Sequence, residues 1–248
     1  MNATEWVRAT DPEPMLKAVQ VKQHRRAVRL FSCACCRRLS SFLLPESLAS
    51  VEVAERYADN LCSRTELDHA HAGANGAVLS LPRDWLWPVT RLRYATSAAA
   101  ECSKGVAATT PGATAIADKA AHAVALDAAI AVPEREFARA RDAAHTTERA
   151  AQADLVREIF GNPFRPDGFS PDWRTDTVLV LAHLIYEERD FGAMPILADA
   201  LQDAGCENPE LLAHCREPGA HVRGCWALDL VLGKVRAEGA CEFVPQMV

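Results

Sequence analysis

Apolar residues recur at helical spacing through most of this chain, and alanine runs such as Ala98–Ala100 are frequent. Val28, Phe31 and Cys35, for example, follow one another at intervals of three and four residues. Such intervals place side chains on one face of an α-helix, whereas no stretch alternates convincingly with the period of two expected of a strand. The sequence therefore predicts an all-α fold, either a multi-helix bundle or an irregular helical array.

Size and charge narrow the class of protein further. The chain has 248 residues, of which 49% are hydrophobic and 24% charged, so it can bury a core of ordinary size. Its net charge is -6, and its basic residues form no more than a short cluster between Lys22 and Arg29. Because a nucleic-acid binder usually presents a broad basic face, we do not expect a nucleic-acid partner. The purely helical pattern instead favours another protein as the partner.

The N-terminal sequence and the cysteine content favour a cytoplasmic protein. Residues 1–6 lack the basic and apolar stretches of a signal peptide, and the longest apolar runs are too short to span a bilayer. We therefore expect no membrane association. In the cytoplasm thiols or metal ligands are expected before disulfides. The nine cysteines are Cys33, Cys35, Cys36, Cys62, Cys102, Cys206, Cys215, Cys225 and Cys241.

Capping signals give the approximate ends of the N-terminal helices. Thr10 with Pro12 and Glu13 resembles a capping box, which predicts a helix running to about Pro45. Further on, Pro133 predicts a break between two helices, and Gly161 predicts a helix end.

The stretch Asn162–Asp172 is rich in proline and glycine and is the best domain boundary. We therefore predict an N-terminal helical region, 1–161, and a C-terminal helical region, 162–248, or a single domain that contains both. In the second region a helix can start either at Ser170 with Pro171 or at Thr175, and Asn208 is suited to cap another helix. The last predicted helix covers His221–Leu232 and stops at Gly233.

Three groups of segments carry a resemblance to a known family. They are CACCRR (33–38), ERAAQ (148–152) leading into IFGNPFRP (159–166), and DAGC (203–206) followed by HVRGCW (221–226). In these segments and in their order along most of the chain, the protein resembles an uncharacterised family of bacterial proteins common in planctomycete-type genomes. The resemblance implies a bacterial, cytoplasmic origin and no known activity.

The C-terminal cysteines and histidines are the strongest candidate site. Tetrahedral zinc needs about four nitrogen or sulfur ligands, which Cys206, Cys215, His221 and Cys225 could supply. His214 is adjacent to Cys215, and helix geometry turns the two in different directions, so we expect only one of them to contribute.

Two other interpretations use the same residues. In a helix, His221, Cys225 and Asp229 would form one row, which suggests an activated thiol. However, Asp229 and His221 would lie about two turns apart, which is poor geometry for a catalytic relay. The interpretation that we favour is a buried thiol at Cys225, with Asp229 paired to Arg216 or Arg223.

The remaining clusters suggest packing rather than chemistry. Cys33 and Cys36 form a CxxC, but inside a predicted helix it lacks the strand-to-helix context of a redox site, so we expect core cysteines. We interpret His69 and His71 as part of a solvated helix end. The isolated histidines His122, His145 and His183 are interpreted as packing or surface residues.

No HExxH, GxSxG or GxGxxG motif announces an enzyme. Three hypotheses follow. The first is a helical interaction or scaffold protein that binds another protein, without catalysis. The second is a structural protein that binds zinc through the C-terminal cluster, and the third is a thiol- or metal-dependent enzyme centred on His221 and Cys225.

Overall fold

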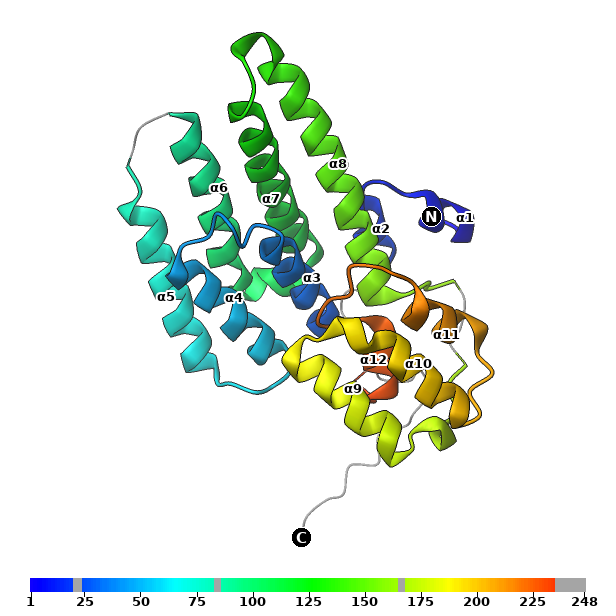
Figure 1. Cartoon of the computed structure of the whole chain (residues 1–248). Helices are drawn as coiled ribbons and strands as arrows, with labels where there is room; N and C mark the ends of the chain where they lie inside the picture. The colour runs from blue at the N-terminus through cyan, green and yellow to red at the C-terminus, as the bar shows by residue number, and fades with distance from the viewer. Residues whose placement is uncertain (20–23, 83–85, 165–167, 235–248) are drawn as a thin grey trace. The chain divides into compact units, whose positions relative to one another are not determined.

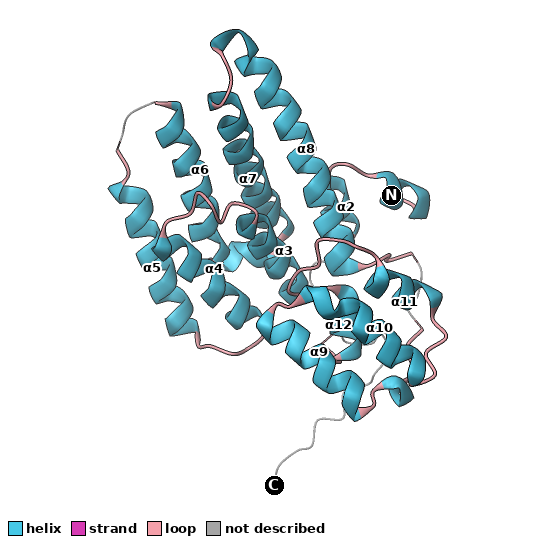
Figure 2. Ribbon diagram, viewed as in Figure 1, coloured by secondary structure: helices cyan, strands magenta, loops and turns pink. Residues whose placement is uncertain are grey.

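The computed structural model describes residues 1–19, 24–82, 86–164 and 168–234. Helices joined by turns make up these ranges, and none of them contains a strand (Figure 2). The predicted all-α fold is therefore confirmed. Within the same ranges, no helix combines the length and the apolar character needed to cross a lipid bilayer.

Contacts between residues divide the chain into two compact units. The first unit is Met1–Pro166 with Val222–Gly224, and the second is Asp167–His221 with Cys225–Val248. The first unit contains α1 (Ala3–Arg8), α2 (Pro12–Ala18), α3 (Arg25–Arg37), α4 (Pro45–Ala58), α5 (Arg64–Ser80), α6 (Trp87–Cys102), η1 (Gly105–Ala108), α7 (Thr110–Ile130) and α8 (Glu134–Phe160).

Helix α3 forms the centre of the first unit. It packs against α4, α6, α7 and α8, and every residue from Val28 to Cys36 is buried. Around it, α7 lies alongside both α6 and α8 (Figure 1). The buried faces of α6 and α7 consist largely of alanine, which lets helices approach closely and loses no side-chain entropy on folding.

Basic residues of α3 make contacts within this unit. The Arg29 guanidinium is buried and donates hydrogen bonds to the carbonyls of Cys102, 2.6 Å away, and Lys104, 3.0 Å away. A cation is favourable there because α6 ends at Cys102 with unsatisfied carbonyls. Arg26 forms an ion pair with the buried carboxylate of Asp59.

The predicted continuous helix from Thr10 to about Pro45 is wrong in two respects. Asp11, not Thr10, is the N-cap, because its carboxylate accepts the Glu13 N–H. The segment is also divided into α2 and α3, because Val19 adopts an extended conformation after α2. Part of the connection lies outside the described residues. By contrast, the predicted break at Pro133 and the helix end at Gly161 are confirmed.

The interpretation of His69 and His71 as a helix end is also wrong. Both lie within α5, whose N-cap Ser63 forms a capping box with Glu66. His71 Nδ1 lies 2.9 Å from the Ala100 carbonyl, which can only accept a hydrogen bond, so this nitrogen donates.

The second unit consists of short helices around a smaller core. These are η2 (Pro171–Trp173), α9 (Asp176–Glu188), η3 (Phe191–Ala193), α10 (Met194–Asp203), α11 (Pro209–Arg216) and α12 (Trp226–Val231). Of the two predicted starts, Thr175 is the N-cap of α9, whereas Ser170 caps the short η2. Asn208 caps α11, as predicted. Apolar side chains from α9 to α12 form the core, together with the thiols of Cys206, Cys215 and Cys225.

Candidate metal centre

The turn that follows α11 positions the candidate site. His214 lies in the last turn of α11. Cys225 is the N-cap of α12, and its carbonyl oxygen accepts the Asp229 N–H. The predicted helix over His221–Leu232 therefore begins only at Trp226. A left-handed backbone at Gly224, with φ of 91°, interrupts helical geometry immediately before it.

Three donor atoms of the second unit converge at this turn. His214, His221 and Cys225 each offer one ligand atom, and these atoms lie within 4.8 Å of one another. His214 Nε2 is 3.2 Å from Cys225 Sγ, and the two imidazole rings meet edge to face with centroids 5.0 Å apart. The Trp226 ring covers His214 at 4.9 Å. Cys225 is fully buried, whereas the two histidines are partly exposed.

This arrangement suits a transition metal ion. Neutral imidazole and thiolate are ligands for zinc, and two donors on one tetrahedral zinc ion lie roughly 3.5 Å apart, given bonds of about 2.0–2.3 Å. The observed separation of 3.2 Å between His214 Nε2 and Cys225 Sγ needs little adjustment to reach that value. An ion bound there would be held by two nitrogens and one sulfur of this unit.

The ligand set differs in part from the one proposed from sequence. His221 and Cys225 are brought together, but by a turn rather than by adjacent turns of one helix. His214, in the last turn of α11, is the third member of the group. As expected for two adjacent residues of one helix, only one of His214 and Cys215 contributes. Cys206 and Cys215 are buried in the core of the same unit, and the group includes neither. Burial raises the pKa of the Cys206 thiol, despite a hydrogen bond from the Asn208 backbone.

The structure removes the basis for a catalytic relay along one helix. Asp229 lies on α12, but His221 lies in the turn before it, so the two do not share a helical row. Of the arginines suggested as partners for Asp229, Arg216 forms an ion pair with Asp199 and Arg223 forms one with Asp59.

The cysteines of the CxxC segment are core residues, as the sequence predicts. Cys33, Cys35 and Cys36 lie on α3 and are fully buried beside Cys102, whose sulfur is 3.3 Å from that of Cys36. Burial raises the pKa of the Cys35 thiol above its ordinary value. Protonated, inaccessible thiols react slowly, so this cluster does not form a reactive dithiol.

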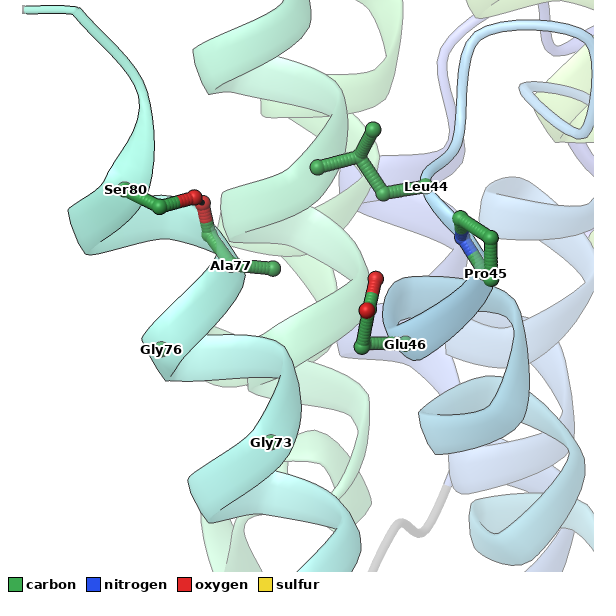
Figure 3. A pocket seen from close by; sticks show the side chains of 7 residues that line it. All are labelled: Leu44, Pro45, Glu46, Gly73, Gly76, Ala77 and Ser80. Carbon is green, nitrogen blue, oxygen red and sulfur yellow. Dashed lines mark hydrogen bonds between the residues drawn. The ribbon is translucent and has the colours of Figure 1, made fainter.

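The first unit also has an open cleft between the start of α4 and α5. Figure 3 shows Leu44, Pro45 and Glu46 on one side and Gly73, Gly76, Ala77 and Ser80 on the other. Its volume is about 570 Å³. Among the described residues that line the cleft, Glu46 is the one that is ionisable.

Comparison of the chain with protein-family models, with curated proteins and with solved structures found no match. The resemblance to the planctomycete-type family therefore stays a prediction from the sequence.

Proposed function

We propose that the second unit is a metal-binding unit in which His214, His221 and Cys225 hold a zinc ion. The observation that carries the proposal is the convergence of two imidazoles and one thiol within 4.8 Å. A cytoplasmic location, proposed from the sequence, would keep the Cys225 thiol reduced and available as a ligand.

The role that fits this position is structural. The ion would connect the end of α11 to the start of α12, helices of only 8 and 6 residues. Helices shorter than about 12 residues are marginal on their own, so a metal cross-link would add to the stability of both. Catalysis at Cys225 is less well supported, because a fully buried thiol offers a substrate no access.

Metal analysis of the full-length chain, purified without a histidine tag, tests this proposal. After dialysis against zinc, we expect the C225A variant to lose the equivalent that depends on this site. Cobalt in place of zinc should give the wild type a thiolate-to-cobalt charge-transfer band that C225A lacks. The matched control is C206A, which removes a buried thiol of the same unit that lies outside the group, and it should keep both signals.

The thermal midpoint gives an independent readout. Zinc at about 100 times its dissociation constant should stabilise the wild type by about 2.7 kcal/mol and C225A by much less. A wild type without the charge-transfer band would contradict the proposal. Loss of the band in C206A as well as in C225A would restore the ligand set proposed from sequence.

The protein-interaction role expected from the sequence is a second candidate, favoured by exposed apolar residues on α9. Val180 and Leu184 are 66% and 55% exposed, and their spacing of four residues places them on one face. We propose a second copy of the chain as the partner to test. Sedimentation over a range of concentrations should show a dimer that the V180E/L184E variant abolishes, whereas a wild type that stays monomeric would contradict self-association through this face.

A further inference from the structure

A second group of metal-ligating side chains lies in the first unit, between α7 and α8. Asp118 and His122 are one turn apart on α7, and His145 approaches from α8, which packs along α7. Each residue offers one ligand atom, and the three atoms lie within 4.8 Å of one another. His122 and His145 are partly exposed packing residues, in line with the sequence interpretation, but their rings contact each other. The packing of two helices brings together residues that are distant in sequence.

The His122 ring has a defined orientation. Its Nδ1 lies 2.8 Å from the backbone carbonyl of Asp118, and because a carbonyl can only accept, Nδ1 carries the proton. The lone pair of the neutral ring is therefore on Nε2. Tyr94 stacks on this ring with centroids 5.3 Å apart and planes inclined by 24°. A hydrogen bond from one imidazole nitrogen to a carbonyl is the usual support of a histidine that binds metal through the other.

His145 presents a nitrogen that lacks a protein partner. Its Nε2 is buried and has no hydrogen-bond partner among the described residues. Its ring meets that of His122 edge to face, with centroids 5.0 Å apart. Burial, with a contribution from His122, lowers the pKa of His145.

The carboxylate of Asp118 supplies a negative charge beside the two rings. One of its oxygens is 3.5 Å from His122 Nδ1, and the residue is exposed, so it can move without disturbing the core. Two imidazoles and one carboxylate are a common ligand set for zinc and for other divalent transition metals, with water in the remaining positions.

We propose that His122 and His145, with Asp118 as a third ligand, bind a divalent transition metal ion between α7 and α8. This site has two nitrogens and one oxygen, so it differs in donor set from the sulfur-containing centre of the second unit. It lies wholly within the first unit and does not depend on the proposed function.

The C225A protein isolates this site because it lacks the thiolate ligand of the other centre. Titrated with Zn²⁺, full-length C225A should bind one equivalent that both C225A/H122Q and C225A/H145Q lose. C225A/D118N should bind this equivalent about 10- to 100-fold more weakly. The matched control is C225A/H183Q, which changes an exposed helical histidine outside both groups and should bind like C225A.

A spectroscopic measurement keeps His122 and His145 unchanged. Electron paramagnetic resonance of Cu²⁺ bound to C225A/H214Q/H221Q, which lacks all three ligands of the other centre, counts the coordinating nitrogens, and we expect two imidazoles. Fewer than two would overturn the proposal, as would an unchanged zinc equivalent in H122Q and H145Q. If wild-type protein lacks the thiolate-to-cobalt band but C225A/H214Q/H221Q still binds Cu²⁺ through two imidazoles, the proposed function fails and this inference stands.

Discussion

Arg38 and Glu148 form the ion pair that joins two of the segments behind the sequence resemblance. The Glu148 carboxylate is 3% exposed and accepts two hydrogen bonds from the Arg38 guanidinium, each 2.8 Å long. The Gln152 amide also lies near Glu148 and donates to the Ala117 carbonyl at 2.8 Å. A charge so deeply buried depends on its partner, because water cannot replace the lost hydrogen bonds.

Replacing Arg38 should therefore lower the free energy of unfolding far more than replacing an exposed cation does. We expect R38A to lower the free energy of unfolding by about 2–3 kcal/mol, somewhat below the full cost of a broken buried pair because Arg38 is partly exposed. The control is K17A, which breaks the exposed Lys17–Glu13 pair and should cost less than about 0.5 kcal/mol. Urea denaturation monitored by circular dichroism measures both, and equal losses would contradict this assignment.

At the scale of elements, the junction between η1 and α7 depends on a single glycine. Thr109 caps α7, and its hydroxyl accepts the Gly112 N–H at 3.2 Å. A β-carbon at Gly112 would lie 2.0 Å from the Val106 carbonyl oxygen, so backbone would have to move. Because α7 begins at Thr110, Gly112 lies in its first turn.

The G112A variant should accordingly be destabilised by about 2–3 kcal/mol through this overpacking. G105A is the matched control, since no atom lies within 4 Å of a β-carbon placed at Gly105 of η1. It should change the free energy of unfolding by less than about 0.5 kcal/mol. Thermal denaturation of the two variants compares them directly, and a G112A protein as stable as G105A would show that the junction shifts freely.

At the scale of the whole molecule, buried thiols make stability depend on pH in the alkaline range. Burial raises the pKa of Cys35 and of Cys102 above the ordinary value of 9.0, and a hydrogen bond to Cys102 together with burial raises that of Cys33. Above about pH 9 these thiols ionise in the unfolded chain but stay protonated in the folded one. The folded state then binds more protons, so stability falls as pH rises.

The stability that the protonated, buried thiols contribute should be fully present below about pH 9. Above that pH, the free energy of unfolding should fall by about 1.4 kcal/mol per pH unit for each thiol. Urea denaturation between about pH 8 and 10 measures the slope, before most lysines and tyrosines ionise. C35A should reduce the slope by about 1.4 kcal/mol per unit, whereas K17A should leave it unchanged. A wild-type stability that does not fall above pH 9 would contradict the assignment of these thiols to the core.

Several elements were predictable because their signals are local. Thr175, Asn208 and Gly161 act on backbone groups within one turn, and the spacing of apolar residues in α3 indicates a helix. The same information could not distinguish Asp11 from Thr10 as a cap, since both side chains can accept the same N–H.

The sequence by itself determined the helical class and several helix ends, because each depends on residues within a few positions of one another. Only the tertiary structure decided which side chains meet. His221 approaches Cys225 through a turn that needs Gly224 in a left-handed conformation, and His122 meets His145 because α7 packs on α8. Donor atoms converge through packing of segments separated along the chain, and no local pattern encodes that packing.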